Sequence, residues 1–130
     1  MSSELEKGLY TKLVAASTTA SSRIYPDLPQ GVTFPAIRYS RITTERRLSL
    51  NSTVGVTSAT IQVDSFATSY SAAKTLADEV RTALHGFSGT LGTLTARLIK
   101  LETENDLTER DGDRVTHMVA QRYALYTDMD

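Results

Sequence analysis

The 130-residue sequence predicts an α+β fold, in which an antiparallel sheet built from two long hairpins has two helices packed against it. Segments that alternate polar and apolar residues come in two pairs, which is the pattern of strands with one buried face. Two further segments carry apolar residues three and four positions apart, which is the spacing of an amphipathic helix. Helices placed before and between paired strands are typical of α+β domains. We expect one domain, residues 1–130, because a chain of this length folds around a single core.

The first helix is predicted over residues 4–16, where Leu5, Leu9 and Leu13 repeat at helical spacing. A run rich in serine and threonine, residues 17–22, follows directly. Short hydroxyl side chains bond to nearby backbone groups and favour caps and turns, so we expect the helix to end there.

The second helix is predicted over residues 71–84 and has the clearest pattern. Its apolar residues lie on one helical face, and Gly86 stands where a C-terminal cap is expected. The apolar face consists of Ala73, Leu76, Ala77, Val80 and Leu84.

The first strand pair is predicted over residues 36–42 and 59–66. In the first of these strands Ile37 and Tyr39 share one face, and the residues between them share the other. The connection, residues 43–58, is polar. Loops longer than about 12 residues in compact domains are usually functional or disordered. We interpret this stretch as a projecting loop between antiparallel strands.

The second strand pair is predicted over residues 94–103 and 114–126. The intervening residues 105–113 are acidic, and Asp111 followed by Gly112 is a strong turn signal. We therefore expect a second long hairpin with a polar tip.

Composition excludes several classes of protein. The chain has no cysteine, so disulfides, thiolate metal sites and cysteine nucleophiles are absent. Its net charge of -1 argues against a dedicated nucleic-acid-binding protein, for which a strongly basic surface is usual. No apolar run approaches the roughly 20 residues that cross a bilayer. The first residues carry acids where a signal peptide carries positive charge, so we expect a soluble cytoplasmic product with no membrane association.

Nothing in the sequence has the pattern of an active site, and we expect no catalytic, cofactor or metal site. Neither His85 nor His117 has a second ligand at a metal-binding spacing. The glycines at 86, 89 and 92 follow a helix and open a strand, the reverse of a phosphate-binding loop, and favour turns. The acidic residues 102–113 do not match the EF-hand spacing.

Charge is instead segregated into two segments. Residues 38–47 carry four arginines against Glu45, and residues 102–113 carry six acids against Arg110. Opposite charge on separate projections suits head-to-tail association between copies, although both segments could equally be ordinary surface. The residues that we predict to form a subunit or partner interface are Arg38, Arg41, Arg46, Arg47, Glu102, Glu104, Asp111 and Asp113.

The chain resembles the tail-completion, or tail-terminator, proteins of long-tailed bacteriophages and related prophages. The resemblance spans nearly the whole sequence and rests on the succession of elements rather than on one diagnostic motif. The segments that carry it are residues 4–13 (ELEKGLYTKL), 23–26 (RIYP), 34–39 (FPAIRY), 61–67 (IQVDSFA) leading into 70–80, and the acidic turn 111–113 followed by a strand ending near Tyr126.

The resemblance implies an α+β subunit of a hexameric ring in the tail-neck region of a virion, present in the host cytoplasm during assembly. Such a ring terminates polymerisation of the tail tube and joins the tail to the head. It contacts the tail tube protein on one face and a head-completion or neck protein on the other. DNA passes through its lumen without sequence recognition, and neither a cofactor nor an enzymatic activity is implied.

Two alternatives remain open at the level of sequence. The chain could be another neck component, such as a head-completion protein. It could also be a small nucleic-acid-binding module that uses the arginines of residues 38–47, a reading opposed by the overall acidity and the absence of tryptophan.

Overall fold

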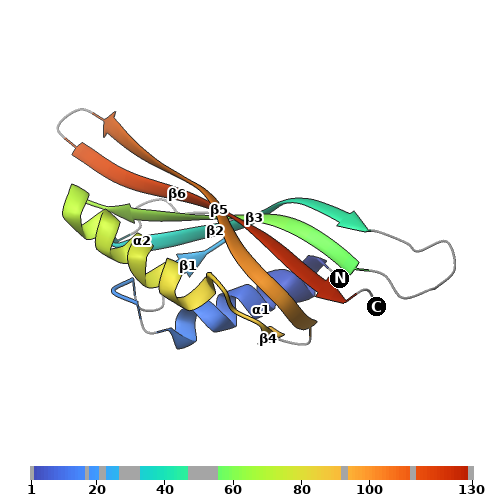
Figure 1. The fold of residues 1–130 in the computed structure, drawn as a ribbon. Helices are drawn as coiled ribbons and strands as arrows, with labels where there is room; N and C mark the ends of the chain where they lie inside the picture. The colour runs from blue at the N-terminus through green and yellow to red at the C-terminus, as the bar shows by residue number, and fades with distance from the viewer. Residues whose placement is uncertain are drawn as a thin grey trace, which may run out of the picture.

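The computed structural model of the chain describes residues 2–16, 18–20, 23–26, 33–46, 56–91, 94–111 and 114–128. The described residues form two helices and one sheet, and Figure 1 shows the helices packed against this strongly twisted sheet. In chain order the elements are α1 (Ser2–Ala15), β1 (Ile24–Tyr25), β2 (Ala36–Arg46), β3 (Val56–Ala67), α2 (Tyr70–Leu84), β4 (Gly89–Leu91), β5 (Leu94–Asp111) and β6 (Arg114–Asp128).

The strands form a six-stranded sheet in the order β1-β2-β3-β6-β5-β4. The α+β class is confirmed, but the prediction of a purely antiparallel sheet built from two hairpins is wrong, because β1 runs parallel to β2. The Ile37 N–H donates to the Arg23 carbonyl at 2.9 Å, which fixes this edge. A two-residue strand is too short to show an alternating pattern, so only tertiary pairing reveals it. The strand β4 is a second short addition, at the opposite edge.

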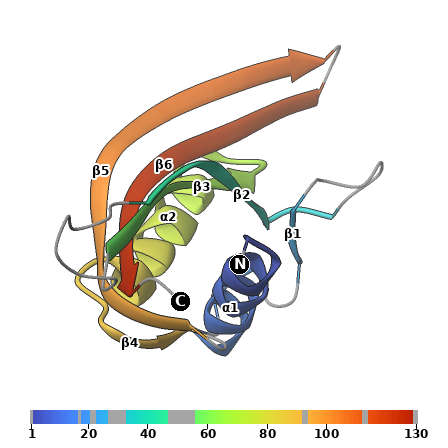
Figure 2. The same ribbon diagram turned by 90° about the vertical axis from the view of Figure 1, so that its right-hand side faces the viewer.

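Both helices lie on the concave face of the curled sheet, as Figure 2 shows. The core contains Leu9 and Leu13 from α1, Leu76 from α2, and Ile61 and Tyr123 from the sheet, each almost completely buried. Burying side chains of this size contributes about 1.5–3 kcal/mol each. The core is therefore the space enclosed between the two helices and β2, β3, β6 and the first half of β5.

The second helix begins and ends as its sequence predicts, to within one residue. The Ser69 hydroxyl accepts a hydrogen bond from the Ala72 N–H at 3.2 Å and caps the N-terminus. After the C-cap at His85, Gly86 has a φ of +79°, a left-handed conformation that a residue with a Cβ rarely adopts. The Gly86 N–H then donates to the Ile99 carbonyl at 2.7 Å, so the end of the helix is tied to β5.

The long strands extend further than predicted. A loop is predicted over residues 105–113, but β5 continues to Asp111, and residues 103–111 pair in unbroken register with residues 114–122 of β6. Backbone pairing with β6 supports this polar segment, so its composition is a poor guide to its structure. Similarly, β2 continues to Arg46 and β3 begins at Val56, and the rest of the predicted projecting loop, residues 47–55, lies outside the described residues.

Three register shifts bend the sheet. One lies between Arg41 and Thr43 of β2, and two lie in β5, around Arg97 and around Glu102. An extra residue in one strand kinks it and increases its twist. The last shift divides β5 into two parts, which we call proximal β5 (residues 94–101) and distal β5 (residues 103–111).

Candidate interaction surfaces

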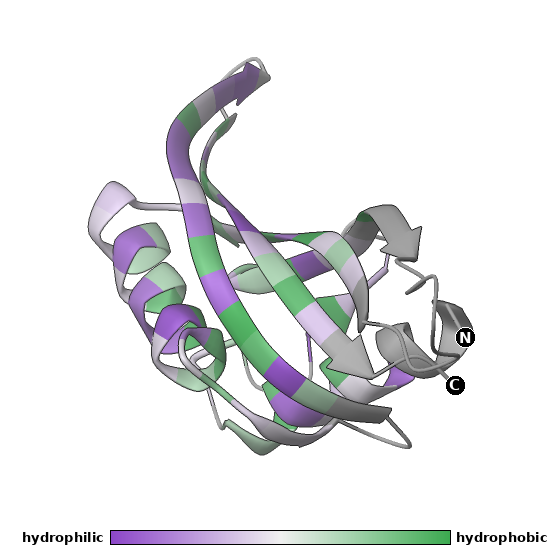
Figure 3. Cartoon of the chain, turned by 45° about the vertical axis from the view of Figure 1, so that its right-hand side comes forward, coloured by the Kyte–Doolittle hydropathy of each residue, from purple (hydrophilic) through white to green (hydrophobic). Residues whose placement is uncertain are grey.

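Distal β5 is the most exposed part of the described sheet. Every described side chain from Glu102 to Arg110 is exposed, and Leu107 retains 48% of its accessible surface. In Figure 3 the hydrophobic bands of β5 concentrate where the strand crosses the helices, and its far end is mainly hydrophilic. With its partner β6, this segment forms a two-stranded projection beyond the helices (Figure 1). A projecting, polar segment of this kind is available for contacts with another molecule.

Two side chains of α2 fasten distal β5 to the helix through Asp106, and we call these three residues the latch. The Tyr70 hydroxyl donates to Asp106 Oδ2 at 3.1 Å, and Lys74 Nζ donates to Asp106 Oδ1 at 3.1 Å. Lys74 also lies 3.8 Å from a carboxylate oxygen of Glu104. The hydrogen bond with Asp106 raises the pKa of Lys74 above its ordinary value, so the ammonium is charged when the latch is closed. The groups are exposed, so the latch orients the strand more than it stabilises the fold.

A buried amide lies beneath the latch. Gln121, on β6, is fully buried, and its Nε2 donates to the Ala77 carbonyl at 3.1 Å and to Glu104 Oε1 at 2.8 Å. Its Oε1 accepts a hydrogen bond from the Tyr123 hydroxyl at 3.0 Å. Burial raises the pKa of the Tyr123 phenol, which keeps this donor protonated. The network joins α2, β5 and β6 at the point where distal β5 begins.

The convex face of the sheet carries a row of paired polar side chains. Arg38 donates to Asp64 Oδ2 through Nε at 3.0 Å and through NH2 at 2.7 Å, and Gln62 donates to Asp64 Oδ1 at 2.9 Å. Arg122 donates in turn to Gln62 Oε1 at 3.1 Å. Asp64 is only 2% exposed, so these bonds compensate the burial of its charge. A shallow hollow of about 730 Å³ beside this row is lined by Gln62, Arg122 and Glu102.

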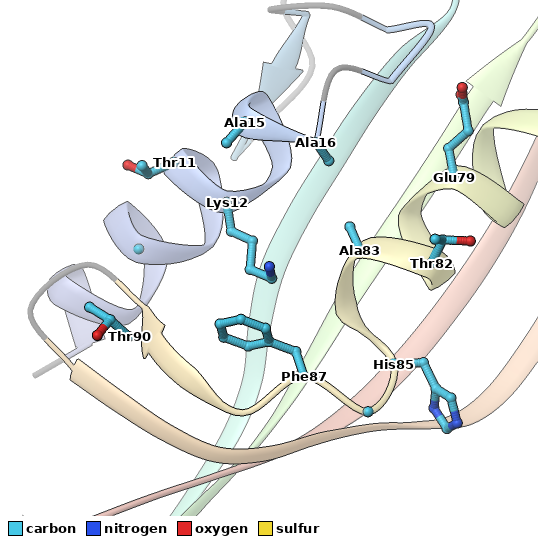
Figure 4. A pocket seen from close by; sticks show the side chains of 12 residues that line it. Thr11, Lys12, Ala15, Ala16, Glu79, Thr82, Ala83, His85, Phe87 and Thr90 are labelled. Carbon is cyan, nitrogen blue, oxygen red and sulfur yellow. The ribbon is translucent and has the colours of Figure 1, made fainter.

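A groove of about 750 Å³ lies between α1 and the end of α2, and Figure 4 shows its lining. Lys12 Nζ lies 3.6 Å from the centre of the Phe87 ring, a cation–π contact across the groove. The His85 Nδ1 accepts a hydrogen bond from the Leu101 N–H at 3.0 Å, so this ring nitrogen is already hydrogen-bonded to β5. Apart from Glu79, the remaining described lining consists of alanine, threonine and glycine, and the described part of the groove brings together no residues with the pattern of a catalytic site.

The predicted interface residues fall into three groups in the structure. Arg38 is bonded to Asp64, and Glu104 is bonded to Gln121 and lies near Lys74. Glu102 is exposed and lines the convex hollow. For the remaining five, the side chains lie outside the described part of the molecule: Arg41 and Arg46 are placed by backbone on β2, Asp111 by backbone on β5, and Arg47 and Asp113 are not described.

Two relationships among these residues were not visible in the sequence. In a regular strand Glu102 and Glu104 would share one face, because side chains alternate. Glu102 is instead the extra residue of a bulge, so Glu102 faces the convex hollow and Glu104 faces α2. The strands that carry the basic and acidic segments, β2 and β5, are separated by β3 and β6. The basic and acidic segments therefore lie on strands toward opposite edges of one sheet, with two strands between them.

Neither the latch nor the role of Gln121 was predicted from the sequence. A signal for Gln121 was present, since it occupies an inward position of β6 between the buried Val119 and Tyr123. The latch had only a weak signal, the four-residue spacing of Tyr70 and Lys74, because Asp106 approaches from a distant part of the chain.

Among the residues that the structure describes, no three histidine, aspartate or glutamate side chains gather closely enough to hold a metal ion. Neither α1 nor α2 has the length and apolar character needed to cross a membrane. The described fold and surfaces thus define a small α+β protein whose most exposed strand segment is a largely polar projection.

Comparisons with known proteins show the family to which the chain belongs. The family model described as tail completion protein gp17 matches residues 9–128, so the chain belongs to this family of structural phage tail proteins. A solved structure of the virion of a native gene transfer agent particle contains a chain of similar fold, with a TM-score of 0.65 and 15% identity over 93% of this chain and 92% of that chain. At this identity the likeness concerns the fold alone. No individually curated protein matches the sequence.

Proposed function

We propose that this protein is the tail terminator of a long-tailed phage or phage-like particle. In this role it forms a hexameric ring at the head-proximal end of the tail tube, terminates tube polymerisation and joins the tail to the head. The observation that carries the proposal is the family match over residues 9–128, together with a fold similar to that of a chain in a phage-like virion. The protein acts structurally, without catalysis or a cofactor.

The arrangement of the sheet supports ring formation. A closed ring needs a heterologous interface, in which one patch of a subunit meets a different patch of its neighbour. The basic segment on β2 and the acidic segment on β5 are two such patches, because β3 and β6 separate them within one subunit. Opposite charge steers two patches together and disfavours pairing of each patch with itself.

The ring also presents two different faces to two different partners. One face contacts the tail tube protein, and the other contacts a head-completion or neck protein, while DNA passes through the lumen without specific recognition. A subunit with a net charge of -1 suits such a channel, because a strongly basic lumen would retain DNA. The protein assembles in the host cytoplasm and remains in the neck region of the virion.

Loss of the gene tests the proposal. We expect tails of uncontrolled length, or tails that fail to join heads, in lysates viewed by electron microscopy. Normal joined particles in the mutant lysate would exclude the function. Gold labelling of a tagged copy in whole particles separates a tail terminator, which lies on the tail side of the neck, from a head-completion protein, which lies on the portal side.

Charge reversal tests the proposed contact between subunits. We expect the double variant Arg46→Glu, Arg47→Glu to reduce ring formation, and an additional Glu102→Arg or Glu104→Arg substitution to restore part of it. Individual charges at an interface rim contribute little, so both arginines are replaced. Native mass spectrometry measures the ring population, and unchanged populations in the double variant would contradict the pairing. Glu102→Arg is the cleaner compensating change, because Glu104 is bonded to Gln121.

A further inference from the structure

Within the described chain, long stretches of strand edge on distal β5 and on β2 pair with no other strand. In the described chain, β4 pairs with β5 only at residues 94–96, and Phe87 and His85 cover the edge at Ile99 and Leu101. No described strand pairs with the outer edge of distal β5. On the other side, β1 pairs with β2 only at Ile37 and Arg38, and no described strand covers the outer edge of β2 from Arg41 to Arg46.

The register shows which backbone groups these open edges present. The N–H groups of Ile99 and Leu101 point away from β6, toward Phe87 and His85. The bulge at Glu102 shifts the alternation of β5 by one residue. Beyond it, the residues whose backbone groups point away from β6 are those opposite Gln121, Val119 and His117. Distal β5 therefore presents the backbone groups of Glu104, Asp106 and Thr108 at its open edge.

The same count applies to β2. The Ile37 N–H points outward to Arg23, and the bulge around Ile42 moves the alternation by one residue. The outward backbone groups beyond the bulge are those of Thr44 and Arg46. Each open edge thus offers alternate donors and acceptors, at three residues of distal β5 and at two residues of β2, which is the requirement for adding a strand.

We propose that the ring closes by strand addition, in which distal β5 of one copy pairs antiparallel with β2 of the next copy. This inference rests on the proposed ring and specifies its interface. Three successive antiparallel pairs separate β2 from β5, so the two strands run in opposite directions within a subunit. A neighbour that continues the sheet therefore places its β2 antiparallel to β5.

Charge and apolar surface favour a second copy as the occupant. Residues 103–110 carry three acids against one arginine, whereas residues 41–46 carry two arginines against one glutamate. Each edge also exposes one large apolar side chain, Ile42 at 42% and Leu107 at 48%. Two copies of the same edge would bring like charges together, so β5 selects β2 rather than another β5.

A register with Arg46 opposite an acidic residue of distal β5 satisfies both the backbone and the charges. Setting Arg46 opposite Glu104 pairs outward residues with outward residues, and it sets Thr43 opposite Leu107 at a position without hydrogen bonds between the new partners. Opposite residues at such positions have Cα atoms about 4.5 Å apart, within the range of a disulfide. The chain has no native cysteine, so engineered thiols report on this pair without interference.

The test is disulfide formation in assembled particles that carry the full chain with Thr43→Cys and Leu107→Cys. We expect non-reducing gels to show a ladder of linked subunits, with each single variant limited to dimers. A pairing shifted by two residues would link Thr43→Cys to Asn105→Cys or Glu109→Cys instead and would still support strand addition. If Thr43→Cys forms no disulfide with Leu107→Cys, Asn105→Cys or Glu109→Cys, and the tails have normal length, strand addition is overturned and the proposed function stays intact. Absence of the protein from tails would refute the proposed function itself.

A proline substitution provides an independent test. Thr108→Pro and Thr108→Ala both remove the hydroxyl that lies 3.3 Å from His117 Nδ1, but only proline removes the outward N–H. We expect Thr108→Pro to enter particles about tenfold less than Thr108→Ala, which corresponds to the loss of about one hydrogen bond. Both variants should unfold at similar temperatures, because the lost N–H does not bond to β6. Equal incorporation at equal stability would overturn the proposal.

Discussion

Proximal and distal β5 belong to one strand and share one partner, β6, yet different forces hold them. Proximal β5 buries Ala96 and Ile99 in the core, and its outer edge is covered by β4 and the end of α2. Distal β5 has only exposed described side chains, and it is held by pairing with β6 and by the latch on Asp106. Regular strand geometry therefore persists where burial ends, and the exposed surface of the strand begins at that boundary.

The largest expected difference in stability between proximal and distal β5 comes from the burial of their side chains. Ile99→Ala should lower the free energy of unfolding by about 2–5 kcal/mol, because it leaves a cavity beside a fully buried position. Leu107→Ala, in the same strand, should change it by no more than about 0.5 kcal/mol, since its side chain is half exposed. Urea denaturation followed by circular dichroism measures both. Equal losses would show that the distal segment is part of the core.

The next largest loss of stability is expected at Gln121, whose hydrogen bonds join α2 and β6 to β5 where its proximal and distal parts meet. Gln121→Leu should cost about 2 kcal/mol, because it leaves the buried Tyr123 hydroxyl and the Ala77 carbonyl without their partner. Adding Tyr123→Phe should recover part of this loss by removing one of the orphaned groups. Denaturation midpoints of the single and double variants test the coupling, and strictly additive losses would argue against it.

A smaller effect is expected where the end of α2 covers proximal β5. Gly86→Ala should cost about 1 kcal/mol, because a φ of +79° is unfavourable for alanine. In the described chain no atom beyond the neighbouring residues lies within 4 Å of the added Cβ, so the effect is conformational rather than steric. Gly86→Asn is the matched control, since asparagine tolerates this conformation better and should cost less. Similar losses for both residues would point to a cause other than φ.

The smallest effect on global stability should come from the latch. Asp106→Ala should leave the unfolding midpoint nearly unchanged, because its partners are exposed. It should nevertheless speed amide hydrogen exchange in distal β5, where local opening requires no core exposure. Glu109→Ala removes a carboxylate from the same segment without touching the latch and serves as control. If both variants exchange alike, the latch does not restrain the segment.

Much of the fold could be predicted from short-range patterns. The period of apolar residues identified both helices, and the alternation of Ile37 with Tyr39 and of Ile61 with Val63 identified strands whose inward faces are buried. The cap at Gly86 was also readable, because a single residue type suits that backbone conformation. These features depend on residues within a few positions of one another.

The candidate surfaces were less predictable. The sequence indicated that charge is segregated, and the resemblance to tail-completion proteins is confirmed by the family match. The pairing of Arg38 with Asp64 and of Glu104 with Gln121 could not be read from sequence, since each depends on strand neighbours that the register selects. The specific interface contacts remain predictions for the experiments above.

By itself, then, the sequence determined the class of fold, the helices, the buried strand faces and the family. Only the tertiary structure decided that β1 joins the sheet in parallel, that β5 continues through its acidic stretch, and that a bulge turns Glu102 and Glu104 to opposite faces. The physical reason is that local patterns show which side chains avoid water. Strand partners, register and open edges are set instead by backbone hydrogen bonds between distant segments. Every residue type can form these bonds, except that proline has no N–H to donate, so the sequence does not reveal them.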